Sequence, residues 1–256
     1  MDGVELGARF SLATSRLRYC GPDGADRLLE RAIREPAARP AARAALAQFE
    51  ALMPYLETIA RAHGRDPFDE AVMEAYWIGN DLLDGLGRPE FRTLIDALQR
   101  RGLPRSLADR LRTHLPREPL LHHLFHVAFV GVGNVTGHVA TTVAHMESCR
   151  PAWGTVTRIG SEELELRAAA LRRDGPCLAW GPERPVRLPF EAALLPDLRP
   201  GATVAYHWGR PALELSEEAA QRLGDYSARA LAAANEVLPA LGVLEDGTAT
   251  EPASGT

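Results

Sequence analysis

The chain has 256 residues and 46% hydrophobic content, which suffices for one large or two modest globular domains. Its formal net charge is −5, so we expect no general attraction to nucleic acid or to an anionic membrane. All 29 basic residues are arginine. No apolar run reaches the roughly 18 residues of a membrane span, and the first residues lack the pattern of a signal peptide. The three widely spaced cysteines do not form a disulfide framework and fit a reducing cytoplasm.

Residues 1–148 are predicted to form an all-helical domain. We expect its first 23 residues to be irregular, because the Gly21-Pro22 pair is typical of a turn. Pro54 is expected to kink or divide the longest predicted helix. Apolar spacing and capping residues predict helices over residues 27–35, 41–63, 68–83, 89–100 and 106–115.

The hydrophobic period changes after residue 148, from helical spacing to the alternation typical of strands. Short strands are predicted over residues 153–159, 163–171, 177–180, 185–189 and 202–208. Several short strands at this spacing favour a small OB-like β-barrel. Ser216 caps a last helix, and the polar residues after it predict a disordered tail over 241–256. The predicted fold class is therefore α+β, with a helical domain over 1–148 and a barrel plus helix over 149–240.

A histidine-rich segment, residues 119–149, ends the helical part and closes with Cys149. Its first half would place His122, His123 and His126 at helical spacings of three and four. Its second half would place His138, Thr142, His145 and Cys149 along one face of a helix. Imidazole and thiolate are the usual ligands of zinc, nickel and iron, so this segment is a candidate metal site. The alternative is a set of hydrogen-bonded core histidines that bind no metal.

Cys20 is a further candidate metal ligand outside this segment. It stands directly before the predicted turn, which places its thiol near the surface. A reactive thiol of lowered pKa and a structural cysteine are both compatible with that position.

The β-rich part resembles the HypC family of nickel–iron hydrogenase maturation chaperones. The resemblance covers roughly residues 149–225 and lies in three pieces that occur in the same order: Cys149-Arg-Pro-Ala-Trp-Gly-Thr-Val156, Leu194–Gly209 with its Tyr-His-Trp-Gly ending, and Leu215-Ser-Glu-Glu-Ala219. The helical part, with Tyr19-Cys-Gly-Pro22 and Glu74-Ala-Tyr-Trp-Ile-Gly-Asn80, looks like an uncharacterised bacterial family associated with hydrogenase gene clusters.

The HypC resemblance implies a cysteine that carries an Fe(CN)₂CO precursor and a partner that is the hydrogenase large subunit or another maturation protein. Cys149 would take the cysteine role, and His207 would stand for the histidine that ends a strand. This chain departs from the family because its cysteine is internal and provides no free amine. Either His138 and His145 replace that ligand, or the site is lost and the β-rich part only docks.

Three functions follow from these observations. The first is an accessory protein for metallocentre assembly, with iron as the expected metal and zinc or nickel as alternatives. The second is a His/Cys-ligated metalloenzyme or haem protein, for which Glu147 is the one acidic residue inside the histidine-rich segment. The third is a structural adaptor without metal. On the first reading, Cys149 forms the functional centre with His145 and His207, while Trp153 and Trp208 close the barrel.

Overall fold

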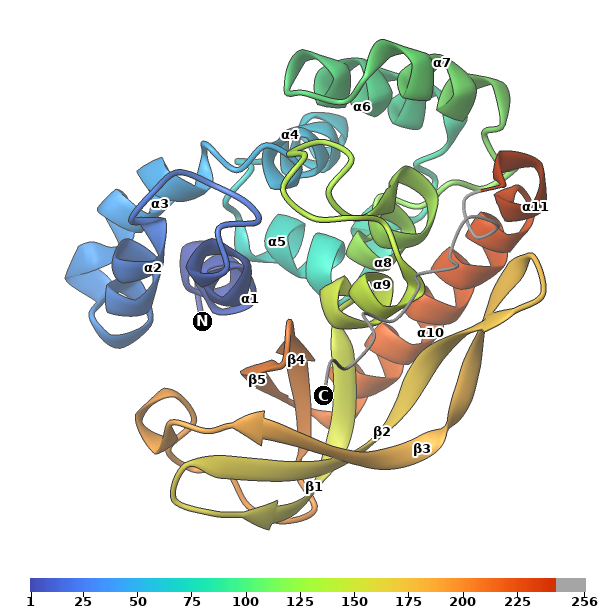
Figure 1. The fold of residues 1–256 in the computed structure, drawn as a ribbon. Coiled ribbons are helices and arrows are strands. Elements are labelled where there is room, and N and C mark those ends of the chain that lie inside the picture. Colours follow the sequence, from blue (N-terminus) through green and yellow to red (C-terminus); the bar gives the residue numbers. More distant parts are fainter. Residues whose placement is uncertain (243–256) are drawn as a thin grey trace, which may run out of the picture.

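The computed structural model describes residues 1–242 and shows an α+β protein (Figure 1). Helices α1–α9 form one side of the molecule, and a β-sheet covered by the long helix α10 forms the other. The helices span α1 Gly3–Arg16, α2 Ala25–Arg34, α3 Arg39–Leu46, α4 Leu52–His63, α5 Glu70–Trp77, α6 Arg88–Arg100, α7 Arg105–Thr113, α8 His123–Phe125, α9 Val143–Cys149, α10 Glu217–Asn235 and α11 Leu238–Leu241.

Helix α1 occupies a segment that the sequence predicted to be irregular, so that prediction is wrong. The carboxylate of Asp2 caps this helix by accepting a hydrogen bond from the backbone N–H of Glu5 at 2.9 Å. Glycine at position 7 lets the helix approach α5 closely, since a Cβ there would lie 2.7 Å from Cε of Met73. Burial of residues such as Phe10 therefore stabilises a segment whose own helix propensity is low.

The other predicted helices are largely confirmed, with changes at their ends. Helices α2, α6 and α7 lie close to their predicted positions. The predicted helix over 41–63 is divided, but between residues 46 and 52 rather than at Pro54. Pro54 lies in the first turn of α4, where its missing N–H breaks no helical hydrogen bond.

The histidine-rich segment is not a pair of regular helices. One helical turn, α8, leads into the π-helix η3 His126–Gly131, and a loop over 132–142 follows before α9 begins. A Cβ at Gly133, where φ is +76°, would clash with the carbonyl oxygen of Val139, so this tight loop requires glycine there. His138 lies in the loop, and the predicted helical face from His138 to Cys149 does not exist.

The sheet contains five antiparallel strands in the order β3-β2-β1-β4-β5. The sheet is open, because β3 and β5 are edge strands that do not pair with each other, so the predicted small OB-like β-barrel is not confirmed. The two short strands predicted over 177–189 are one long strand, which tolerates its prolines because it lies at an edge. The strands span β1 Ala152–Ile159, β2 Glu163–Asp174, β3 Cys177–Pro189, β4 Thr203–His207 and β5 Arg210–Leu215.

Two clusters of buried apolar residues stabilise the molecule. The smaller lies within the curled sheet and includes Val156, Leu166 and Val204. The larger contains residues of the helical part together with residues of the sheet and α10, such as Ala205 and Leu223. This cluster therefore has members on both sides of residues 148/149, where the sequence predicted a boundary between two domains. That boundary stays a prediction.

The predicted tail over 241–256 lies outside the described residues, apart from its first two positions at the end of α11.

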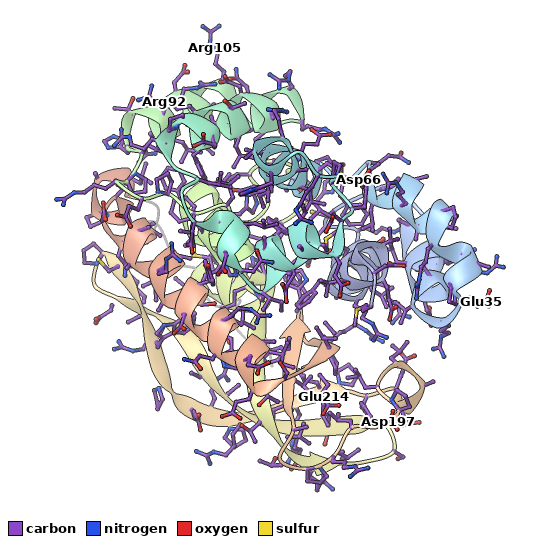
Figure 2. The ribbon with its side chains drawn as sticks, turned by 180° about the vertical axis from the view of Figure 1, so that it is seen from behind. Glu35, Asp66, Arg92, Arg105, Asp197 and Glu214 are labelled. Atoms are coloured by element: carbon purple, nitrogen blue, oxygen red, sulfur yellow. The ribbon has the colours of Figure 1, made fainter. Side chains whose placement is uncertain are left out.

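Charged side chains cover the outside of the molecule. Figure 2 shows labelled examples on the helical part and on the β-rich part, all of them exposed: Glu35, Asp66, Arg92, Arg105, Asp197 and Glu214. Among the described residues, no helix combines the length and the apolar character that crossing a membrane would require.

Candidate metal centre

Three buried side chains from distant parts of the chain meet between the helices and the sheet. They are His123 at the start of α8, Cys149 at the end of α9 and His207 at the end of β4. One nitrogen from each imidazole and the thiol sulfur all lie within 4.8 Å of one another. The sulfur of Cys149 is 3.7 Å from Nε2 of His123, close to the roughly 3.5 Å expected between neighbouring ligands of a tetrahedral zinc ion.

Hydrogen bonds orient both imidazoles toward this meeting point. Nδ1 of His207 donates to the carbonyl oxygen of Phe10 at 2.7 Å, because a carbonyl can only accept. Its Nε2 is therefore a free acceptor, and it has no hydrogen-bond partner in the described protein. Nδ1 of His123 lies 2.7 Å from the hydroxyl of Tyr76, which leaves its Nε2 for the Cys149 side. A backbone carbonyl behind the imidazole, as at His207, is an arrangement typical of metal-binding histidines.

Backbone contacts hold Cys149 and His207 together. The hydroxyl of Thr142 caps α9 by accepting from the N–H of His145 at 3.1 Å, which fixes the start of the helix that ends at Cys149. At its end, the carbonyl of Ser148 accepts a hydrogen bond of 2.7 Å from the N–H of Trp208. Because Ser148 and Trp208 are the neighbours of the two ligands, this single bond sets their separation.

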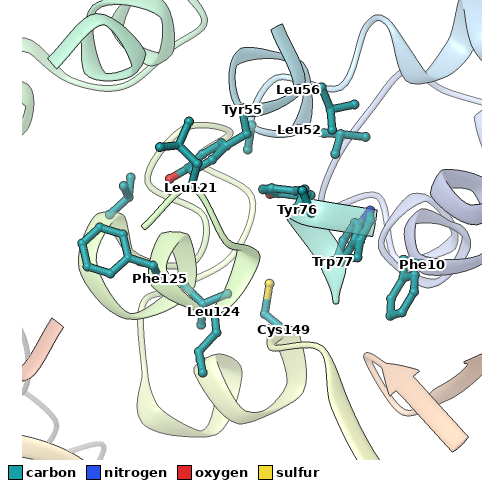
Figure 3. Packing of buried hydrophobic residues seen from close by; sticks show 14 of the residues in the cluster. Phe10, Leu52, Tyr55, Leu56, Tyr76, Trp77, Leu121, Leu124, Phe125 and Cys149 are labelled. Atoms are coloured by element: carbon teal, nitrogen blue, oxygen red, sulfur yellow. The ribbon is translucent and has the colours of Figure 1, made fainter. Parts of the chain in front are cut away.

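A small cavity of about 50 Å³ adjoins the three side chains. Its wall is mainly apolar and aromatic, and in Figure 3 the thiol of Cys149 points toward Tyr76 and Trp77. The loop over 132–139 lines the cavity on another side. Within the described residues, no aspartate or glutamate lines it.

Burial keeps the three groups uncharged in the metal-free protein. It raises the pKa of the Cys149 thiol to about 12 and lowers the pKa of His207 to about 4. The pKa of His123 lies well below its usual range, again through burial first and then through the neighbouring imidazoles of His207 and His126. Neutral imidazole is the form that binds metals, whereas the thiol has to lose its proton.

Other candidate ligands lie near the centre without joining it. His126 lines the cavity, but its Nδ1 lies 3.1 Å from the hydroxyl of Tyr55. His122 is buried, and its Nδ1 accepts a hydrogen bond from the N–H of Leu124. Cys20 also lines the cavity, and burial raises the pKa of its thiol above the usual range.

His138 and His145 lie away from the three side chains. His138 is exposed in the loop before α9. Nδ1 of His145 lies 2.7 Å from the carbonyl oxygen of Ala140, and its ring packs against Trp208 at 5.9 Å between centroids. The structure thus places His123, rather than His145, beside Cys149 and His207.

The roles predicted for three other residues change. Trp208 and Trp153 do not close a barrel: both are half-buried, Trp208 lines the small cavity, and Trp153 packs against Trp180. Glu147 binds the buried guanidinium of Arg150 at 2.7 Å and accepts from the N–H of Leu171, so it joins α9 to β2.

Sequence reasoning missed the groups behind the imidazoles. Tyr76 lies in the segment Glu74–Asn80, but no pattern indicated that its hydroxyl contacts His123. The carbonyl of Phe10 belongs to the helix that was not predicted. One sequence signal near the site was available. Trp208 stands directly before Gly209 in the chain, and a bulky aromatic residue is unusual in a tight hairpin turn.

The fold and this site define an α+β protein with a buried group of two histidines and one cysteine that could bind a metal ion. The chain belongs to a family of unknown function, DUF6390, whose model matches residues 1–240. Comparison with curated proteins and with solved structures finds no match.

Proposed function

We propose that this protein binds a single transition-metal ion through His123, Cys149 and His207. The observation that carries the proposal is the convergence of three ligand atoms from three distant segments, with each imidazole held from behind by a hydrogen bond. Histidines that only fill a core need no free nitrogen facing a thiol. A thiolate with two imidazoles suits zinc, iron or nickel.

A cysteine nucleophile activated by histidine is the main competing use of a Cys149–His123 pair. That chemistry requires a thiolate of lowered pKa. Burial here acts in the opposite direction on both groups, since it raises the pKa of the thiol and lowers that of the imidazole. A metal ion does not need a thiolate of lowered pKa or a charged imidazole. It binds the thiolate directly and binds imidazole in its neutral form.

The cavity favours a metal-binding role over haem binding or hydrolysis. A volume of about 50 Å³ accommodates a few atoms, which is far less than a porphyrin requires. The carboxylate that the sequence offered for acid–base chemistry, Glu147, is engaged with Arg150 and Leu171.

The narrower form of the proposal is an accessory role in nickel–iron hydrogenase maturation. The protein would hold an iron precursor at Cys149 and dock on the immature large subunit or another maturation protein. The support is the HypC resemblance of residues 149–225, which implies a role for Cys149 and His207, two of the three side chains that meet in the buried group. An OB-like character of the β-rich part belongs to this proposal. Since Cys149 is buried, release of the metal would require movement of the loop over 132–142.

The test is metal binding by purified protein and by single variants. We expect one zinc or cobalt ion per chain, and we expect Cys149→Ser to weaken binding more than 100-fold. Loss of an outer hydrogen-bond partner costs about 10–100-fold, so loss of a direct ligand should exceed that range. Cys177→Ser, His138→Ala and His145→Ala are the matched controls and should bind like wild type. Equal binding by Cys149→Ser would refute the proposal.

A further inference from the structure

We propose that the metal centre keeps a fourth coordination position for a small anion, and that the indole N–H of Trp208 donates a hydrogen bond to that anion. The inference rests on the proposed metal site and adds the class of its ligand. The anion would contain two or three heavy atoms, as azide and cyanide do.

The position is open because the protein supplies three ligands. Structural zinc sites use four protein ligands, whereas sites with three leave the fourth position to water or to another ligand. The cavity beside His123, Cys149 and His207 provides that space, and a water molecule needs about 10–15 Å³ of such volume. A cavity of about 50 Å³ therefore has room for a ligand of a few atoms.

The charge of the centre favours an anion. A divalent ion bound by one thiolate and two neutral imidazoles keeps a net positive charge. Among the described residues, no carboxylate lines the cavity to neutralise it. In a mainly apolar cavity such a charge attracts a small anion more strongly than it would in water.

Trp208 supplies a donor without an acceptor. Its Nε1–H is buried and has no hydrogen-bond partner in the described protein, although the residue lines the same cavity. The Nε1–H of Trp77, which also lines the cavity, is likewise unpaired. Buried N–H groups are nearly always paired, so an unpaired one in a residue that lines a candidate site calls for a partner.

The backbone holds Trp208 in a costly conformation at this position. Trp208 and Gly209 form the two-residue turn between β4 and β5, and their φ angles are +48° and +67°. Turns of this kind prefer Asn, Asp or Gly at both positions, and a bulky residue there is strained. Because His207 directly precedes the turn, the same hairpin fixes one metal ligand and the indole donor relative to each other.

The experiment is an azide titration of cobalt-loaded protein followed by its visible spectrum. Trp208→Phe removes the N–H and keeps an aromatic ring. Trp77→Phe makes the same change at the second cavity-lining indole with an unpaired N–H, so the pair of variants decides which of the two indoles is the donor. We expect Trp208→Phe to bind cobalt normally and azide about 10–100-fold more weakly, the effect of losing a hydrogen bond to a charged group. Trp77→Phe should stay within roughly threefold of wild type.

Two outcomes would overturn the inference while leaving the metal site intact. One is a cobalt-loaded wild type whose spectrum does not respond to azide, and the other is an equal loss of azide affinity in both variants. A wild type that binds no cobalt would instead remove the proposed function and this inference together.

A second measurement does not depend on the folding of Trp208→Phe. Nitrogen-15 labelling of the four indole groups allows their N–H signals to be followed in zinc-loaded wild type. Azide should move the Trp208 proton signal downfield in the zinc-loaded protein and leave it unchanged in the metal-free protein. An unchanged signal with zinc present would refute the hydrogen bond.

Discussion

Burial holds the imidazoles around the cavity in their neutral form. The pKa values of His126 and His207 are both lowered to about 4, and that of His122 to about 3. Each group is protonated more readily in the unfolded chain, where its pKa is near 6.5. The contribution of these residues to the free energy of unfolding is therefore fully present above pH 6.5, and it is lost as the pH falls toward 4.

His126 allows this effect to be measured without a change in the proposed ligands. In metal-free protein, wild type should lose roughly 3 kcal/mol more stability between pH 7 and pH 4 than His126→Phe, because phenylalanine has no proton to bind. The variant leaves the hydroxyl of Tyr55 unpaired, which lowers its stability at both pH values by a similar amount. Urea denaturation at the two pH values gives the difference. Parallel losses in both proteins would contradict the burial argument.

Sequence spacing predicted that this region holds candidate ligands, but it did not predict which of them meet. Cys149 and His145 share a helix, as spacing suggested, yet only Cys149 reaches the cavity. His123 and His207 approach Cys149 through tertiary packing between segments far apart in the chain. One-dimensional periodicity carries no information about such contacts. The identification of His207 came from the family resemblance and not from spacing.

Among the elements, α9 has two roles: it carries Cys149, and it contacts β2. Glu147 makes that contact: one carboxylate binds Arg150, whose side chain is 1% exposed, and the backbone N–H of Leu171. The guanidinium of Arg150 also lies over the ring of Trp180, at 5.0 Å from its centroid. Burial of the Arg150 charge is tolerated only because the carboxylate of Glu147 compensates it.

Glu147→Gln should therefore be costly although it changes the side chain little. We expect the free energy of unfolding to fall by roughly 3–5 kcal/mol, since the substitution leaves the Arg150 charge buried without a counter-ion. Glu183→Gln removes the partner of Arg167 in an exposed pair and should cost less than about 1 kcal/mol. Chemical denaturation of both variants measures the contrast. Similar small losses would show that the Glu147 pair is not an essential link.

Regular amphipathic helices were predictable from the sequence, whereas α1, the π-helix and the open sheet were not. Helices α2 and α6 bury one face and show it in their apolar spacing. Helix α1 is buried around most of its circumference, so it has no such pattern. The π-helix over 126–131 and the open sheet depend on packing partners that only the folded chain supplies.

Across the whole molecule, the proposed metal joins parts that the sequence assigned to different domains. His123 belongs to the helical part, whereas Cys149 begins the β-rich part and His207 ends strand β4 within it. The larger apolar cluster crosses the same division. A metal bound here would link three segments and would stabilise the folded state in proportion to its affinity and free concentration.

X-ray absorption at the zinc edge tests the central claim most directly, because it counts the ligands of the bound ion. The account predicts one sulfur at about 2.3 Å and two imidazole nitrogens at about 2.0–2.1 Å in zinc-loaded wild type, with the remaining position filled by a light atom. The sulfur contribution should disappear in Cys149→Ser and persist in Cys20→Ser. A first shell without sulfur, or one whose sulfur survives Cys149→Ser, would contradict it.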